Sequence, residues 1–298
     1  MPGPGDRIGG YVIDAVIGRG AMGAVYRAHQ ASLDRPVALK LIAAERMADA
    51  EAVASILAEA RTAARIHHPH LVAIHDIIDL PEQRLAGYAM ELVQGSPSTA
   101  LVHASGRFDV RLALRLAAQV AGALGAAHQV GLVHRDVQPA NVLVAPSYDG
   151  PTAKLLDLGL ARERVRTGGT QSGIRQLVLI GTPGFIAPEQ ACNPERATPA
   201  SDVYALAAVL VWWLTGRTAH GGETLIDHVV RSATSVPEID PAVPDGLAEL
   251  LEACLDPDPA LRPGDGAALA LRLGELADHD GEAMRRPPIR PRLRPRRR

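Results

Sequence analysis

The first ninety residues contain short runs in which hydrophobic and polar positions alternate, and this is the pattern of β-strands. The runs cover residues 11–17, 24–28, 36–42, 71–79 and 86–92. Between the third and fourth runs, residues 50–66 place apolar side chains at helical spacing, and Pro69 follows just beyond them. This part of the chain is therefore predicted to form a small sheet with one main helix.

The spacing of apolar residues changes from strand-like to helical after the cluster Gln94-Gly95-Ser96-Pro97, whose residues interrupt helices and strands. Helical spacing is found over residues 110–129, 199–215, 246–255 and 267–277, whereas residues 163–188 show no period. Loops of that length usually serve a function. Strands first and helices later predict an α+β fold with a small β-rich lobe, 1–93, and a larger, mainly α-helical lobe, 94–278.

Composition adds limits on the class of protein. The chain has 298 residues, of which 47% are hydrophobic and 21% charged, as in globular proteins. Cys192 and Cys254 are the only cysteines, and they form no C-x-x-C pair, which argues against a disulfide framework or a structural zinc site. We see no apolar run near the roughly 20 residues of a membrane span and no signal-peptide core. These features lead us to expect a cytoplasmic protein.

Charge is distributed unevenly along the chain. Residues 284–298 hold eight arginines and no acidic residue, so the rest has 23 basic against 33 acidic residues, near −10, although the whole chain is −2. Such a segment buries little apolar surface, so we expect residues 279–298 to be a disordered basic tail. Binding to nucleic acid, binding to anionic lipid, docking on the acidic remainder of the chain and a merely solvated tail all stay open.

Gly18, Gly20 and Gly23 have the spacing G-x-G-x-x-G. Glycines allow backbone N–H groups to approach phosphates closely. A dinucleotide-binding fold needs a helix directly after these glycines, but the β-rich segment AVYRA follows them here. The pattern favours a glycine hairpin folded over a nucleotide, and a tight hairpin without a ligand stays open.

Candidate charged and amide groups occur at three further places. Lys40 ends the predicted strand VALK, and Glu59 lies on the helix face that also carries Ile56 and Ala63. Two later segments, VHRDVQPANVLV and LLDLGLAR, supply carboxylates and an amide that suit proton transfer and magnesium binding: Asp136, Asn141 and Asp157. A solvated lysine at the end of a strand is the ordinary alternative for Lys40.

The order of these segments resembles the eukaryotic-type Ser/Thr protein kinases of bacteria. The motifs are IGRGAMGAVYRA, VALK, ILAEARTAARI, MELVQG, HRDVQPAN, DLG, GTPGFIAPE and SDVYALAAVL, and with the late LRP segment they cover about residues 8–275. The resemblance implies a two-lobed protein-kinase-like fold that transfers the γ-phosphoryl of ATP to Ser or Thr hydroxyls of proteins, using Mg²⁺ or Mn²⁺. It also suggests autophosphorylation, with a homodimer for phosphorylation in trans.

The resemblance implies a set of contacts with ATP. Val25 and Ala38 would pack on adenine, and Met90 would guard the pocket behind it. Glu91 and Val93 would offer backbone groups to the adenine edge. The expected contacts with ATP are Ile17, Gly18, Gly20, Gly23, Val25, Ala38, Lys40, Met90, Glu91, Val93 and Leu143.

The resemblance also implies the catalytic roles. Lys40 would pair with Glu59 and hold the α- and β-phosphates. Asp136 would accept the proton of the substrate hydroxyl, and Asn141 and Asp157 would bind the metal ion. Other polar residues would be structural: Glu189 paired with Arg262, and Asp202 as the anchor of the catalytic loop.

Gln138 departs from the family pattern, because most of these kinases carry a lysine at this position. Glutamine keeps a hydrogen-bond donor and loses a charge, and a charge near 4 Å is worth at most about 4 kcal/mol at an effective dielectric constant of about 20. We therefore expect a rate roughly 10- to 1000-fold lower than with lysine. The alternative is a catalytically weak or inactive pseudokinase that binds ATP and acts as a scaffold.

Other departures and motifs affect specificity and regulation. Leu158, in DLG, keeps an apolar side chain where phenylalanine is usual. Thr182 and Pro139 resemble the Ser/Thr branch, and Thr182 would hydrogen-bond the catalytic aspartate and narrow the site around a small alcohol. Arg135 would meet a phosphate on the activation segment, 157–189, where the candidate phosphorylation sites are Thr167, Thr170 and Ser172. The run His67-His68-Pro69-His70 resembles the turn after the helix more than a metal site.

Overall fold

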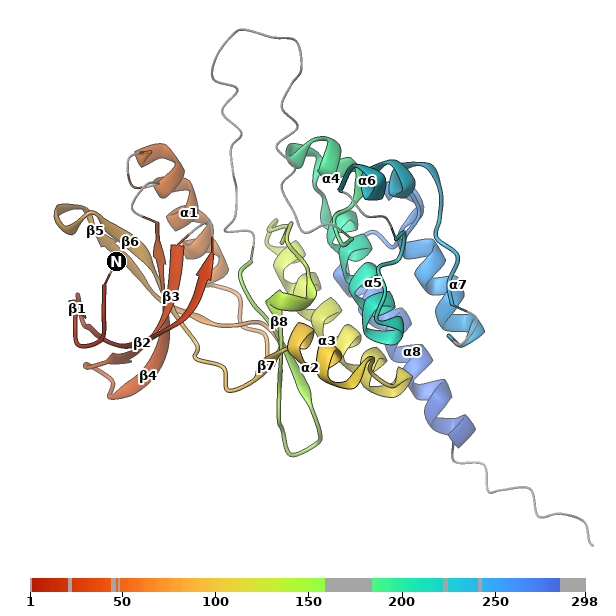
Figure 1. Ribbon diagram of the computed structural model, residues 1–298, viewed down its shortest axis with the longest axis horizontal. Coiled ribbons are helices and arrows are strands. Elements are labelled where there is room, and N and C mark those ends of the chain that lie inside the picture. Colours follow the sequence, from red (N-terminus) through yellow and green to blue (C-terminus); the bar gives the residue numbers. More distant parts are fainter. Residues whose placement is uncertain are drawn as a thin grey trace, which may run out of the picture.

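The computed structural model describes residues 2–20, 23–43, 47, 49–158, 184–221, 225–240 and 243–284. Its described elements form a sheet-rich lobe and a helical lobe, which lie on opposite sides of Figure 1. The α+β, two-lobed fold predicted from the sequence is therefore confirmed.

The small lobe is built on a six-stranded antiparallel sheet with the order β1-β2-β3-β4-β6-β5. Its strands are β1 (Arg7–Ile8), β2 (Tyr11–Gly20), β3 (Gly23–Gln30), β4 (Arg35–Ile42), β5 (Ile74–Leu80) and β6 (Leu85–Met90). Helix α1 (Ala50–Ala63) begins at Asp49, whose carboxylate accepts a hydrogen bond from the N–H of Ala52 at 3.0 Å. Its apolar face packs against the sheet through Val53, Ile56 and Leu57.

The large lobe begins with a short second sheet, β7 (Ser96–Pro97), β8 (Val142–Ala145) and β9 (Thr152–Leu155). The remaining described elements are helices: α2 (Ser98–Ser105), α3 (Val110–Gln129), α4 (Pro188–Cys192), α5 (Pro199–Thr215), α6 (Leu225–Thr234), α7 (Asp245–Cys254) and α8 (Gly266–Met284). A 3₁₀ turn, Pro139–Asn141, precedes β8. The second sheet thus lies between the two large bodies of the fold (Figure 1).

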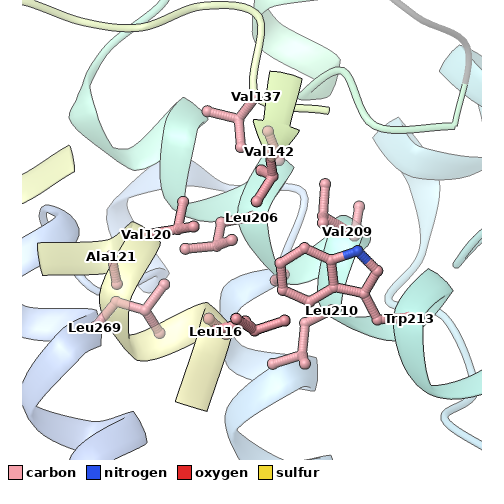
Figure 2. Packing of buried hydrophobic residues seen from close by; sticks show 14 of the residues in the cluster. Leu116, Val120, Ala121, Val137, Val142, Leu206, Val209, Leu210, Trp213 and Leu269 are labelled. Carbon is pink, nitrogen blue, oxygen red and sulfur yellow. The ribbon is translucent and has the colours of Figure 1, made fainter. Parts of the chain in front are cut away.

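Helices α3, α5 and α8 supply the core of the large lobe. Figure 2 shows Leu116 and Val120 of α3 close to Leu206 of α5 and Leu269 of α8, and all four side chains are at most 2% exposed. Val137 and Val142, which flank the polar centre of VHRDVQPANVLV, are buried in the same cluster. The catalytic-loop segment is therefore attached to the core by its apolar residues, while Asp136, Gln138 and Asn141 are half-buried and His134 is buried.

By length and composition alone, α3 could cross a membrane, since its mean hydropathy is 1.3 over the best window. The prediction that no apolar segment is long enough is therefore wrong. In the structure 56% of that window is buried and the helix packs against α5 and α8, so α3 serves as the core helix of the lobe.

The observed boundaries match the predicted ones best in the long helices, and α3 and α5 have the predicted limits. Strand β5 begins at Ile74 rather than residue 71, because the preceding residues bond to β9: Leu155 N–H donates to the His70 carbonyl at 2.8 Å and Val72 N–H to the Leu155 carbonyl at 3.0 Å. Helix α1 ends three residues early, and α8 continues to Met284. Strands β1, β7 and β8 and helices α2, α4 and α6 were not predicted, and β9 was expected only as an apolar strand before Asp157.

Candidate active site

The glycine motif forms an antiparallel hairpin between β2 and β3. Gly18 lies opposite Val25, and Gly20 opposite Gly23. The dinucleotide-binding alternative is therefore wrong, because a strand and not a helix follows the glycines. Gly23 has φ of 145°, and a Cβ there would collide with the Leu41 carbonyl, so this position requires glycine.

Next to the hairpin lies an apolar cluster on one face of the sheet. Ala38 and Met90 are paired across β4 and β6, and both pack with Val25, Val93 and other residues. Ile17 on β2 is 52% exposed, and Leu143 on β8 is half-buried. The structure thus brings Val25, Ala38 and Met90 together, as the interpretation of an adenine pocket requires.

The segment after β6 connects the two lobes and is held by Glu91. The backbone N–H of Glu91 donates to the Ala73 carbonyl at 2.9 Å. Its carboxylate pairs with Lys154 Nζ on β9 at 2.8 Å. These contacts fix the backbone at Glu91, the residue expected to offer a carbonyl to adenine.

The charged centre joins β4 to the segment after β9. Lys40 Nζ lies 2.7 Å from Asp157 Oδ1, so Lys40 forms its ion pair with Asp157. This corrects the prediction that Lys40 pairs with Glu59. Helical spacing predicts which face of α1 carries Glu59, but it does not predict the distance between that helix and β4. Glu59 is half-buried in α1.

Tyr88 completes this centre and was not predicted. Its hydroxyl donates to Asp157 Oδ1 at 3.2 Å, and Lys40 Nζ lies 5.8 Å from the centre of its ring. Burial raises the pKa of the Tyr88 phenol well above its ordinary value, and the negative Asp157 adds to this, so the phenol stays protonated. In the sequence Tyr88 has only the signal of a core aromatic residue in a strand.

The catalytic loop places two amides on the carboxylate of Asp136. Gln138 Nε2 donates to Oδ1 at 2.8 Å, and Asn141 Nδ2 donates to Oδ2 at 2.9 Å and to the Asp136 carbonyl at 2.8 Å. Because the nitrogen of Asn141 faces Asp136, its side-chain oxygen is the atom that would serve as a metal ligand. Asp136, Gln138 and Asn141 thus lie together, as predicted.

Two residues next to the site adopt a left-handed backbone that non-glycine residues rarely occupy, Arg135 with φ of 65° and Asp157 with φ of 55°. The buried carboxylate of Asp202 holds the first of them: it accepts the N–H of Arg135 at 2.8 Å and that of His134 at 2.7 Å. The His134 ring contacts the Leu156 carbonyl at 2.7 Å, next to Asp157. The structural role expected of Asp202 agrees with these contacts.

Glu189 and Arg262 form a buried, two-pronged ion pair with distances of 2.8 and 2.9 Å. Burial acts to raise the pKa of Glu189, but hydrogen bonds from Arg262 and Ser201 and the charge of Arg262 outweigh it and hold that pKa below its ordinary value. This contact fixes α4, and Gln190 of the same helix donates its amide to the Arg135 carbonyl. The pair expected from the sequence is therefore present.

The donor set fits a magnesium ion held jointly with a nucleotide. Within the described residues there is no group of three His, Cys, Asp or Glu side chains that would bind a metal alone. Mg²⁺ instead needs one or two protein oxygens beside phosphates and water, and Asn141 and Asp157 are the residues that would supply these. His70 of the histidine run contacts the Ala153 carbonyl at 3.0 Å, in agreement with a structural turn.

Several predicted residues lie outside the described part of the chain. These are Thr182, the candidate phosphorylation sites and most of the basic tail, so their predicted roles stay predictions. Leu158 is described, and it is 5% exposed within the large hydrophobic cluster, as expected of an apolar plug.

Comparison with known proteins agrees with this geometry. Residues 11–273 match the protein kinase domain. The chain is 35% identical over 284 residues to the serine/threonine-protein kinase PknA of Mycobacterium tuberculosis, with 94% of this chain and 63% of the relative covered. It is 33% identical to PkaA of Streptomyces coelicolor, with 88% and 49% covered. The chain thus spans less than two thirds of the length of these relatives.

A solved structure shows the same fold. The PknI kinase domain of Mycobacterium tuberculosis superimposes with a TM-score of 0.72 and 27% sequence identity, over 92% of this chain and 99% of that one. The matched residues include every described residue of the site, from the glycine hairpin to Arg262. The chain belongs to the protein kinase domain family.

Proposed function

We propose that this protein transfers the γ-phosphoryl of ATP to Ser or Thr hydroxyls of proteins. The observation that carries the proposal is the meeting of three separate segments at one site: β4, the catalytic loop and the segment after β9. Lys40 of the sheet reaches Asp157 at 2.7 Å, and Asn141 reaches Asp136 at 2.9 Å. The names of the relatives, serine/threonine-protein kinases, support the choice of hydroxyl.

The residues divide the work of phosphoryl transfer. Asp136 accepts the proton of the attacking hydroxyl, and the amides of Gln138 and Asn141 orient its carboxylate. A bound Mg²⁺ neutralises charge on the phosphates. Asn141 and Asp157 would supply protein oxygens for that ion, and Lys40, which pairs with Asp157 in this structure, would hold the phosphates. The apolar cluster of Val25, Ala38 and Met90 holds adenine and excludes water.

Regulation by autophosphorylation is part of the proposal. Thr167, Thr170 and Ser172 lie on the segment between Asp157 and Glu189, and a phosphate there would gain charge-assisted hydrogen bonds with nearby arginines. Phosphorylation between two copies of the chain would need only a transient homodimer. The basic tail would add a contact with an anionic lipid surface or nucleic acid.

An ATP-binding scaffold without transfer is the competing function, and Gln138 favours it. The deciding measurement is incorporation of radiolabelled phosphate from ATP with Mg²⁺ into the protein itself and into a general protein substrate. We expect incorporation by the unchanged protein on Ser or Thr, found by phosphoamino-acid analysis, and only background with Asp136→Asn. Equal background in both proteins, with ATP still bound, would establish the scaffold instead.

A further inference from the structure

Tyr88 lies in the middle of β6, directly opposite Lys40 of β4. Its side chain is 2% exposed and points to the same face of the sheet as Ala38 and Met90, because residues two apart share a face. That face looks toward the segment after β9, where Asp157 follows the strand. Tyr88 thus belongs to the small lobe, whereas the carboxylate it contacts belongs to the large lobe.

Tyr88 contacts both charged members of the site. Its hydroxyl donates to Asp157 Oδ1 at 3.2 Å, and Lys40 Nζ reaches the same oxygen at 2.7 Å. The Lys40 ammonium also lies 5.8 Å from the centre of the Tyr88 ring. Within the described part of the chain, both side-chain contacts of the Asp157 carboxylate are made to Oδ1, which leaves Oδ2 as its oxygen for a metal ion.

The apolar surroundings of the Tyr88 hydroxyl make Asp157 its hydrogen-bond acceptor. Tyr88 packs among apolar side chains, with Ala38, Ala60, Val72 and Met90 in one cluster. A small apolar cavity behind Met90, lined by Tyr88, Asp157 and Leu158 among others, adjoins it. A buried hydroxyl needs a hydrogen-bond partner, so the packing of the small lobe fixes where the carboxylate lies.

Asp157 also needs such a contact. Its backbone has a φ of 55°, which is strained for a residue with a Cβ, and surrounding contacts must maintain it. Lys40 cannot do so throughout the reaction, because its ammonium is required at the phosphates. The Tyr88 hydroxyl is neutral and has no second task, so it can hold Oδ1 while Lys40 moves away.

We propose that Tyr88 is a positioning residue that orients Asp157 for Mg²⁺ through the hydrogen bond from its hydroxyl to Oδ1. The inference rests on the proposed binding of ATP with a metal ion. Partners that hydrogen-bond to metal ligands fix the orientation of those ligands, and their loss weakens metal binding by roughly 10- to 100-fold. An ordinary core tyrosine would affect stability alone.

The test compares Tyr88→Phe with Tyr26→Phe, which removes a hydroxyl from an equally buried tyrosine of β3 that does not contact the site. Binding of ATP is measured by calorimetry without Mg²⁺ and over a range of Mg²⁺ concentrations, so the readout needs no turnover. We expect Tyr88→Phe to need roughly tenfold more Mg²⁺ for half-maximal enhancement of ATP affinity. Its Mg²⁺-free affinity, and both affinities of Tyr26→Phe, should stay within twofold of the unchanged protein.

An unchanged Mg²⁺ dependence in Tyr88→Phe overturns the inference. An equal loss with and without Mg²⁺, or loss of the folded state, also overturns it, because either result assigns Tyr88 a purely structural role. Failure of the unchanged protein to bind ATP with Mg²⁺ contradicts the proposed function itself, so the two failures are distinguishable.

Discussion

Gln138 stands where the family resemblance leads us to expect a lysine, and the structure gives its amide a definite partner. The amide nitrogen donates to Asp136 Oδ1 at 2.8 Å. Gln138 therefore orients the carboxylate of Asp136, the proposed base, but lacks the positive charge that a lysine would bring near the transferred phosphate.

We predict that Gln138→Lys increases kcat, because lysine can donate to Asp136 and also stabilise the charge that develops on the phosphoryl oxygens. The increase should be about tenfold or more, with a ceiling of roughly 1000-fold, from about 1.4 kcal/mol per factor of ten. Steady-state phosphorylation of a protein substrate measures it. The matched control is Gln138→Met, which has similar length and no donor, and it should slow transfer. A Gln138→Lys protein slower than the unchanged one would contradict the prediction.

The charged residues at the site show what a sequence can predict about single positions. Motif order selected Lys40, Asp136, Asn141 and Asp157 as candidates, because each has a distinctive neighbourhood along the chain, and the structure brings them into contact in two pairs. It did not identify Tyr88, since a tyrosine in an apolar strand looks like any core residue. The predicted ion-pair partner of Lys40 was also wrong. An ion pair depends on the distance between two elements, and the spacing of residues within one element does not determine that distance.

At the scale of elements, α5 anchors the catalytic loop through one carboxylate. Asp202, near the start of this apolar helix, is 1% exposed and accepts hydrogen bonds from the N–H groups of His134 and Arg135. His128 of α3 makes a third hydrogen bond to this carboxylate, with 2.9 Å between His128 Nε2 and Asp202 Oδ2. Since Gly266 N–H donates to His128 Nδ1, the hydrogen is on Nε2, and His128 donates to Asp202.

We predict that Asp202→Asn lowers both stability and kcat. The substitution keeps the shape but turns one acceptor oxygen into an NH₂ group, which then faces backbone N–H donors. Hydrogen bonds to a buried charge are worth about 1.5–3 kcal/mol each, so a loss of roughly 2–4 kcal/mol is expected. Thermal unfolding and steady-state kinetics measure the two effects. Asp14→Asn is the control, because Asp14 makes only a surface pair with Arg27, and its effect should be under about 1 kcal/mol.

The elements also differ in how well the sequence predicts them. Helices α3 and α5 were predicted with their limits, since long apolar periods carry a strong signal. Strands β8 and β9 have only four residues each, too few for alternation to be decisive. Helix α8 extends past residue 277 over polar residues that have no apolar period. These elements form because the rest of the fold supplies their partners, which is information absent from any local window.

At the scale of the whole molecule, α4, α5 and α6 meet around a buried pair of histidines. His220 and His228 are 8% and 2% exposed, their rings lie 5.7 Å apart, and His220 stacks on Tyr204. Burial, followed by the charges of His228 and Arg231, lowers the pKa of His220 to about 4. Burial also lowers the pKa of His228, although a contact with the Ile186 carbonyl opposes this.

These shifts predict that the protein loses stability as the pH falls from about 6.5 to 4. In this range the unfolded chain binds a proton on the histidine, with a pKa near 6.5, while the folded chain does not. Each step of one pH unit therefore favours the unfolded state, and the sum for His220 is on the order of 3 kcal/mol. The lowered pKa of Glu189 acts in the same direction at still lower pH.

The measurement is the free energy of unfolding by urea at intervals of pH between 4 and 7.5. His220→Phe keeps a ring on Tyr204 and removes the titrating group, so its stability should decline less steeply below pH 6.5 than that of the unchanged protein. His67→Phe, the same substitution at an exposed position, is the matched control. Equal slopes for His220→Phe and the unchanged protein would show that the buried histidines do not govern acid sensitivity. Because His228 contacts the Ile186 carbonyl just before α4, and Gln190 of α4 donates to the Arg135 carbonyl, loss of activity should accompany the loss of stability.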